Sequence, residues 1–238
     1  MKITVINGTQ KHGVTYNLKE IFLDELRDKA EITEFYLPQD CPGFCMGCTQ
    51  CFLDDESKCK DREYIAKIEE AMRSADLLVF ATPTYVYHAT GAMKVMLDHF
   101  GYRWMVHRPA QEFFKKRAFI ITQSIGSGEK SAAKDIKDSL SWWGVTDIRQ
   151  CRFKLMSGIF WDKLPEGKRE KMKALVKKAA ARYRNIDYTK PARTGISTKA
   201  KFYAARFVQL NVGKTDKSGS DYRYWKEMGW LDNARPWK

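Results

Sequence analysis

The sequence has 238 residues but no run of about 18 apolar residues, the length that a membrane-spanning helix requires. Its opening, MKITVINGTQ, has one lysine and then a short apolar run that is broken by Asn7-Gly8, too short for a signal peptide. These two absences predict a cytoplasmic protein with no membrane span. Because thiols stay reduced in that compartment, the six cysteines are not expected to form a disulfide framework.

Acidic residues are scarce in the second part of the chain. Residues 1–100 carry 11 Lys and Arg against 16 Asp and Glu, whereas the rest carries 31 against 13, and the formal net charge is +13. Such a basic region suits a nucleic acid, a membrane surface, an anionic cofactor or an acidic electron-transfer partner. It is equally typical of an ordinary soluble surface, so charge alone leaves the partner open.

Two nucleotide-binding patterns are missing from the loop NGTQKHGVTYN (7–17), which lies between an apolar strand pattern and a helical one. Val14 follows Gly13 where the Walker pattern requires Lys, and G-x-G-x-x-G is absent, so a P-loop NTPase and a Rossmann NAD domain are both disfavoured. The hydroxyls of Thr9 and Thr15 and the N–H groups of a helix start nevertheless suit a phosphate. Alone, the loop is also compatible with a simple turn and helix cap.

Strand and helix patterns alternate up to about residue 185. Strands are expected at 2–7, 31–37, 76–83, 117–124 and 151–155, with helical apolar spacing after each of them. This order predicts an α/β fold with a doubly wound, five-stranded parallel sheet, helices on both faces and ligands at the carboxyl ends of the strands.

Residues 186–238 break this rhythm and are expected to form a basic, aromatic-rich C-terminal extension of a 1–185 domain. We expect one short helix near 198–210, with Tyr203, Phe207 and Leu210 on one face. Packing of these side chains and of the tryptophans against the core or a partner subunit is favoured over a membrane-surface helix.

Two further loops follow predicted strands at the same edge of the sheet. In TPTYVYHATGAMK (82–94), Tyr85 and Tyr87 suit the packing of a flat conjugated ring, and in TQSIGSGEK (122–130) two glycines allow close approach to a ligand. Each loop taken alone is also compatible with an ordinary connection.

Together these loops resemble a known family. Gly8-Thr9-Gln10-Lys11-His12-Gly13-Val14-Thr15 is similar to the phosphate loop G-S-x-R-x-x-G-x-T of the flavodoxin-like NAD(P)H-dependent FMN reductases. Thr82-Pro83-Thr84-Tyr85, with Gly91 to Lys94 and Asp98, resembles the family's S-P-x-Y…S-x-x-x-K-x-x-x-D segment, and the similarity covers about residues 1–155. There are two departures: Lys11 replaces the usual Arg, and His99 stands where an Arg commonly follows Asp98.

The resemblance implies a flavodoxin-like fold and an FMN site. Thr9, Lys11 and Thr15 would hold the phosphate, the 83–87 segment would line the ribityl chain and ring, and Gln123 with 126–128 would close the far edge. The implied cofactor-binding residues are Thr9, Lys11, Gly13, Val14, Thr15, Tyr16, Pro83, Thr84, Tyr85, Val86, Tyr87, Gln123, Gly126 and Gly128.

Five of the six cysteines lie between Cys41 and Cys59, in the spacing C-x3-C-x2-C-x2-C-x7-C. The compact x2-x2 part is typical of loops that bind a [4Fe–4S] cluster. A structural zinc site more often uses two separated C-x2-C pairs, and a redox disulfide uses only two cysteines. The spacing alone leaves these three uses open.

The same run is similar to that of the iron–sulfur flavoproteins, a branch of this family that carries FMN and a [4Fe–4S] cluster near each other across a subunit interface. The resemblance assigns Cys45, Cys48, Cys51 and Cys59 as cluster ligands and leaves Cys41 over. We expect the loop at the same sheet edge as the flavin loops, and Cys151 in the core.

The resulting hypothesis is an FMN-dependent oxidoreductase that moves electrons between NAD(P)H or a ferredoxin-like donor and an unidentified acceptor. A homodimer or homotetramer is expected. Because hydride transfer to a flavin needs no acidic or basic side chain, no catalytic residue is predicted. An FMN-binding electron carrier without turnover is one alternative. A zinc-loop nucleic-acid-binding protein is another, but it leaves the three loops unexplained, so no nucleic-acid partner is expected.

Overall fold

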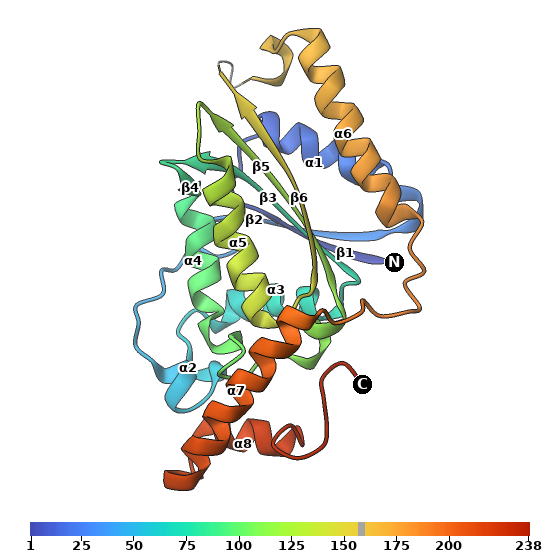
Figure 1. Ribbon diagram of the computed structural model, residues 1–238. Coiled ribbons are helices and arrows are strands. Elements are labelled where there is room, and N and C mark those ends of the chain that lie inside the picture. The colour runs from blue at the N-terminus through green and yellow to red at the C-terminus, as the bar shows by residue number, and fades with distance from the viewer. Residues whose placement is uncertain (157–159) are drawn as a thin grey trace.

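The computed structural model describes residues 1–156 and 160–238 and is built on a central parallel sheet (Figure 1). The strand order is β2-β1-β3-β5-β6, and each neighbouring pair in that order is parallel. The strands are β1 (Lys2–Asn7), β2 (Glu31–Tyr36), β3 (Leu77–Tyr85), β5 (Arg117–Ile125) and β6 (Asp147–Leu155), and the short β4 (His88–Ala89) pairs antiparallel with β3.

This order is that of flavodoxin-like proteins, so the predicted doubly wound, five-stranded parallel sheet is confirmed. β1 is buried from Ile3 onward and β3 from Leu77 to Thr82, since both strands lie inside the sheet with helices on both faces. The sequence expectation omitted only the hairpin strand β4, which is two residues long and has no periodic pattern.

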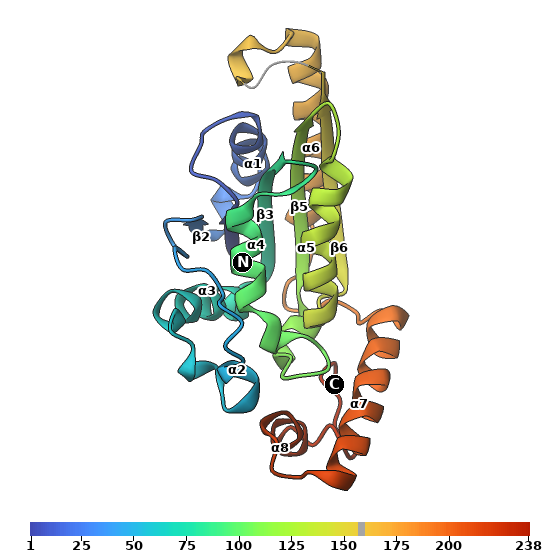
Figure 2. The same ribbon diagram turned by 90° about the vertical axis from the view of Figure 1, so that its left-hand side faces the viewer.

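Helices cover both faces of the sheet (Figures 1 and 2). On one face α1 and α6 share a core that includes Leu18, Phe22 and Val176, and on the other α3, α4 and α5 share a core that includes Ile68, Met96 and Leu140. The bounds are α1 (Val14–Asp24), α2 (Gln50–Leu53), α3 (Arg62–Ser74), α4 (Gly91–His99), α5 (Glu129–Trp143), α6 (Glu166–Arg184), α7 (Ile196–Thr215) and α8 (Ser220–Glu227).

The C-terminal extension contains two helices where one short helix was predicted. α7 is 20 residues long, and α8 follows it at the end of the molecule opposite the β4 hairpin (Figures 1 and 2). A third core forms here, in which Phe202, Trp225 and Trp230 pack with Met105 and Phe114. Among the described helices, none combines the length and the apolar character that a bilayer crossing needs.

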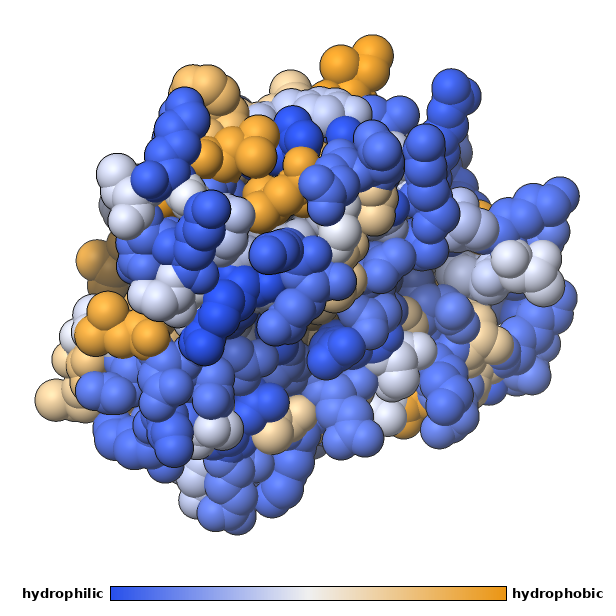
Figure 3. All heavy atoms as spheres, turned by 90° about the horizontal axis from the view of Figure 1, so that it is seen from below, coloured by the Kyte–Doolittle hydropathy of each residue, from blue (hydrophilic) through white to orange (hydrophobic). Residues whose placement is uncertain are grey.

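The face by which α7 packs also differs from the expectation. Tyr203 and Phe207 are largely exposed, at 48% and 68%, whereas Phe202 and Ala205 are buried. Apolar residues occur on both faces of this helix, so spacing alone does not choose between them. The Phe202 ring stacks on Trp225 with centroids 5.0 Å apart, a contact that the sequence pattern does not reveal. Seen from this end, the surface is mostly hydrophilic with separate hydrophobic patches (Figure 3).

Candidate functional site

A cavity of about 300 Å³ opens at the carboxyl ends of β1, β3 and β5. Every lining residue except Ile125 belongs to the predicted cofactor site. The lining residues are Thr9, Lys11, Gly13, Val14, Thr15, Pro83, Thr84, Tyr85, Gln123 and Ile125. We refer to this set as the flavin cradle. Its position at the strand ends is where ligands bind in doubly wound sheets.

One end of the cradle suits an anion. Gly13 precedes α1 with extended backbone and supplies no side-chain cap, so the first N–H groups of α1 remain available. Thr15 is only 5% exposed, yet its Oγ1 has no hydrogen-bond partner among the residues that the structure describes. A buried hydroxyl without a partner is costly, so the chemistry of this end favours a ligand oxygen. Lys11 adds a positive charge at the rim.

The wall of the cradle contains a second hydroxyl of this kind. Thr84 Oγ1 is buried and likewise finds no partner within the described part of the chain. It lies just before a tight turn in which Val86 and Tyr87 have φ of 47° and 67°. Gly128 supports this turn, because a Cβ at its φ of +105° would lie 2.7 Å from Thr84 Cγ2 and from Tyr87 Cα.

The phosphate-type loop is fixed to the start of α4. Thr90 Oγ1 donates to the Gly8 carbonyl at 2.6 Å and accepts the Met93 N–H at 3.2 Å, which makes it the N-cap of α4. A Cβ on Gly8 would lie 2.5 Å from Thr82 Oγ1. Gly8 is therefore required by close packing at the base of the cradle.

Several predicted cofactor residues lie outside the cavity lining. Tyr16 stacks on His12 with ring centroids 3.9 Å apart, and Val86 and Tyr87 point to solvent at the tip of their turn with exposures of 93% and 63%. Gly126 and Gly128, both with positive φ, shape the loop before α5 without lining the cavity. Ile125 was missed because the predicted strand ended one residue before it.

The four cysteines of the predicted metal site differ in exposure. Cys45 and Cys48 are exposed, and Cys51 and Cys59 are partly buried. Burial raises the pKa of the Cys51 thiol, and the negative charges of Cys59, Cys45 and Cys48 raise it further. By contrast Cys41 belongs to the core, where burial first and then the charges of Asp61 and Cys59 raise its pKa to about 12.

Cys59 also lies close to Asp61 and His99, two residues for which the sequence predicted no role as metal ligands. Ligand atoms of Cys59, Asp61 and His99 lie within 4.8 Å of one another. His99 Nε2 lies 2.9 Å from the Gly43 carbonyl, which can only accept, so Nε2 donates to it, and Nδ1 lies 3.8 Å from Cys59 Sγ. The available signal was His99 itself, which departs from the family's usual Arg.

The thiol loop, which comprises residues 41–59, does not stay at the flavin edge. Thr90, at the start of α4, is bonded to the phosphate-type loop, whereas Cys59 contacts His99 at the end of the same nine-residue helix. That helix is about 13 Å long at 1.5 Å per residue. The expectation that all the thiols share the edge with the flavin loops is therefore wrong for Cys59. The cause is the set of polar contacts that hold the loop beside the end of α4.

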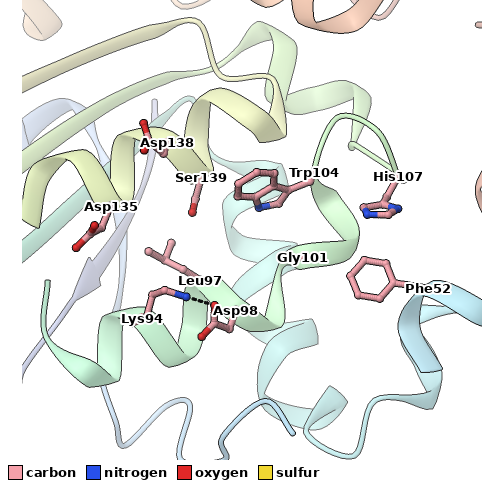
Figure 4. A pocket seen from close by; sticks show the side chains of 10 residues that line it. All are labelled: Phe52, Lys94, Leu97, Asp98, Gly101, Trp104, His107, Asp135, Asp138 and Ser139. Atoms are coloured by element: carbon pink, nitrogen blue, oxygen red, sulfur yellow. Dashed lines mark hydrogen bonds and ion pairs between the residues drawn. The ribbon is translucent and has the colours of Figure 1, made fainter. Parts of the chain in front are cut away.

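A second cavity, of about 460 Å³, lies between α4, α5 and the thiol loop (Figure 4). Phe52, Trp104 and His107 stand at one end, and the helices contribute acidic side chains. These carboxylates already have partners: Asp98 pairs with Lys94, Asp138 with Lys134, and Asp135 with His88. The cavity thus differs from the flavin cradle, whose buried hydroxyls lack partners among the described residues.

Comparison with known proteins identifies the family. Residues 1–158 match the sequence profile described as NADPH-dependent FMN reductase. The chain belongs to this family. The predicted resemblance is confirmed, and the lining of the cradle consists of residues inside the matched region of this FMN reductase family member.

Curated relatives of this family member include iron–sulfur flavoproteins. One from Archaeoglobus fulgidus is 29% identical over 131 residues, which are 54% of this chain and 62% of the relative. One from Clostridioides difficile is 33% identical over 105 residues, 41% of this chain and 45% of the relative. The chain thus aligns with less than two thirds of the length of each of these relatives.

Solved structures support the fold. An FMN-dependent NADH-azoreductase from Bacillus anthracis in complex with FMN has a TM-score of 0.60 at 15% identity and covers 78% of this chain and 100% of its own. A flavone reductase has a TM-score of 0.59 at 13% identity and covers 99% of both chains. At these identities the likeness shows a shared fold alone.

Proposed function

We propose that this chain is an FMN-dependent oxidoreductase that takes electrons from NAD(P)H and holds a [4Fe–4S] cluster on Cys45, Cys48, Cys51 and Cys59. One observation carries the flavin part. The buried hydroxyls of Thr15 and Thr84 line the same cavity, and neither has a partner in the described part of the chain. Family membership supports the same assignment.

In this proposal the residues of the cradle bind and orient the flavin. Thr15, Thr9 and the first N–H groups of α1 hold the phosphate, with Lys11 as a point charge that lacks the bidentate geometry of Arg. Thr84 and Pro83 hold the ribityl side, and Tyr85 and Gln123 flank the ring. Bound FMN supplies the capacity to accept a hydride and to release electrons singly.

The thiol set fits an iron–sulfur cluster by its chemistry. Four cysteines on a short loop offer the ligand type and number that a [4Fe–4S] cube takes, one thiolate for each iron. The names of the curated relatives support the same group. Cys41, buried and with a strongly raised pKa, is not included.

A second candidate for this loop is a single metal ion. The convergence of Cys59, Asp61 and His99 within 4.8 Å favours it, because a mononuclear ion needs ligand atoms directed at one point. The two candidates share Cys59 and therefore exclude each other. They differ in the need for Cys48, which lies outside the three-residue group.

The test is the cofactor content of anaerobically purified protein, followed by steady-state oxidation of NADH and NADPH. We expect FMN, iron and sulfide in the ratio of one flavin to one cube, and NAD(P)H oxidation with an artificial acceptor. Cys48→Ser should lose iron and keep FMN, while the matched control Cys151→Ser should keep both. Protein without flavin overturns the proposal. Stoichiometric zinc would instead support the single metal ion as the ligand of this loop. Bound FMN without NAD(P)H oxidation would indicate an electron carrier without turnover.

A further inference from the structure

The C-terminal extension lies beyond the matched region of residues 1–158, yet it is bonded to the segment that follows α4. Three carbonyls of that segment each accept a side-chain donor from α7 or α8, at 2.6 to 2.7 Å. The donors are Gln209, Trp225 and Tyr224, and the acceptors are the carbonyls of Val106, His107 and Pro109, in that order. The extension therefore fixes the backbone on both sides of Arg108.

The Arg108 side chain, 5% exposed, joins the extension to the thiol loop. Its Nη1 donates to Asp221 Oδ1 at 2.6 Å and to Ser220 Oγ at 3.0 Å, both at the start of α8. Its Nη2 donates to the Cys51 carbonyl and lies 3.4 Å from Glu56 Oε2. One guanidinium group thus contacts the backbone of a cysteine and the first turn of the last helix.

A second contact runs parallel to the first. Ser220 Oγ donates to the Phe52 carbonyl at 2.6 Å, and the Phe52 ring lies 4.5 Å from the ring of His107, centroid to centroid. His107 Nδ1 in turn lies 2.7 Å from Asp221 Oδ2. The two carbonyls that α2 presents here, at residues 51 and 52, are therefore both held by this arrangement.

The charge around Arg108 is balanced inside the protein. Glu56 accepts from Arg103 Nη2 at 2.6 Å, and Arg103 also binds Glu69 on α3. The planar guanidinium of Arg108 directs its two terminal nitrogens to opposite sides, so that one binds Asp221 and Ser220 and the other binds the Cys51 carbonyl and approaches Glu56. Lysine at this position would keep the charge but not the geometry.

We propose that Arg108 is a positioning residue for the thiol loop, and that the extension serves as an internal clamp that holds residues 50–58 through it. The link to metal retention rests on the proposed function, because it requires that the thiols hold a metal. The clamp itself does not, since its contacts involve backbone carbonyls and carboxylates.

The test compares Arg108→Gln, Arg108→Lys and the milder Asp221→Asn with Arg235→Gln. Arg235 lies in the same extension and binds Tyr203 and two nearby carbonyls without touching the thiol loop. Amide hydrogen exchange of residues 50–58, the iron-to-flavin ratio and FMN affinity are measured on each full-length protein.

We expect exchange of residues 50–58 to rise about 10-fold or more in Arg108→Gln, as the loss of charged hydrogen bonds predicts, and less in Arg108→Lys and Asp221→Asn. Iron per flavin should fall in the same order, with FMN affinity changed less than about twofold, and Arg235→Gln should match the wild type. If Arg108→Gln does not fold, Asp221→Asn decides the result.

The clamp is overturned if amide exchange of residues 50–58 in Arg108→Gln is unchanged. If only Asp221→Asn folds, unchanged exchange in that variant overturns it. This holds even when iron and FMN are present as the proposed function requires. Faster exchange in a protein that contains no iron supports the clamp and removes the cluster from the proposed function. The two failures are therefore distinguishable in the same set of samples.

Discussion

The flavin cradle and the thiol loop are built in different ways. The cradle is formed by residues that directly follow three parallel strands, and its shape depends on backbone conformation and on close packing at Gly8 and Gly128. The thiol loop leaves the edge strand β2 and is fixed beside the end of α4 by buried charges, chiefly those of Arg103, Arg108 and Glu69.

The two sites differ in the sequence separation between their residues and the residues that hold them in place. In the cradle the supporting residues are strand ends that a parallel sheet brings to one edge by its topology. In the loop the supports are single side chains 47 to 168 residues away, such as the Arg103–Glu56 and Ser220–Phe52 pairs. A change in the charge network should therefore leave FMN affinity unchanged, and a change in the cradle should leave the thiol loop unchanged.

The largest effect is expected for Glu69→Gln. Glu69 is buried and accepts from Arg62, Arg103 and Tyr102 OH, so its loss leaves Arg62 without this carboxylate and Arg103 with Glu56 alone. Breaking a buried ion pair typically costs about 3–5 kcal/mol. Denaturant unfolding at pH 7 should show a loss of this order, with FMN affinity unchanged. A loss below about 1 kcal/mol, the level of an exposed pair, would contradict the role assigned to these charges.

The same variant should change the acid dependence of stability. Burial opposes ionisation of Glu69, but the charge of Arg103 and the hydrogen bonds from Arg62 and Tyr102 outweigh it and hold its pKa below the ordinary 4.5. A carboxyl with a lowered pKa stabilises the fold above pH 4.5, and this contribution is lost as pH falls through the folded pKa. Between pH 7 and pH 3, the free energy of unfolding should therefore decline less in Glu69→Gln than in the wild type.

A smaller effect is expected for Thr15→Val, which should lower FMN affinity but raise the stability of the flavin-free protein. Removing a hydroxyl that binds a phosphate oxygen should weaken FMN binding by about 1.5–3 kcal/mol, or roughly 10- to 150-fold. The flavin-free protein should become more stable, because the buried Oγ1 has no partner among the described residues. Flavin titration and thermal unfolding of the apoprotein provide the two readouts.

Thr4→Val is the matched control for this change. Thr4 is equally buried, but its Oγ1 donates to the Ala71 carbonyl at 2.8 Å, away from the cradle. Its loss should destabilise the apoprotein and leave FMN affinity as it was. If both variants lower apoprotein stability and neither changes FMN binding, Thr15 has only a structural role.

The smallest effect is expected for Val86→Asn. Val86 has φ of 47°, a conformation that costs a β-branched residue about 1–2 kcal/mol, and its 93% exposure means that little packing is lost. Asn tolerates this conformation, so the free energy of unfolding should rise by about 1 kcal/mol. Val208→Asn, on the exposed side of the helix α7, should give no such gain because the two residues have similar helix propensities. If the free energy of unfolding changes equally in both variants, the backbone conformation at Val86 does not explain the gain.

The position of the cradle at the strand ends follows from sequence patterns for a physical reason. Apolar runs define the strands, each strand is followed by its own loop, and parallel topology then gathers those loops at one edge. The assignment of the lining residues from Thr9 to Gln123 to a cofactor also required the resemblance of these loops to a known family. Two local features were not foreseen: Ile125 lines the cavity one residue beyond a predicted strand end, and Val86 and Tyr87 are exposed in a turn before β4.

The thiol loop was predictable in composition but not in place. Cysteine spacing is visible in the chain, whereas Arg108 and Asp221 belong to no motif and act only through contacts 57 and 113 residues apart. The packing of α7 failed for a related reason. Its apolar residues cover two faces, and only the tryptophans that follow it decide that Phe202 faces inward.

The contact between Ser220 and Phe52 also fixes an order of events in the life of the chain. The two residues are 168 positions apart, so a ribosome completes the cysteine run long before it makes the helix that holds it. During that interval neither Ser220 nor Asp221 is present to hold the loop. The thiols are therefore on an unfastened loop during synthesis, and the finished protein presents them on a loop that its last helices have fastened.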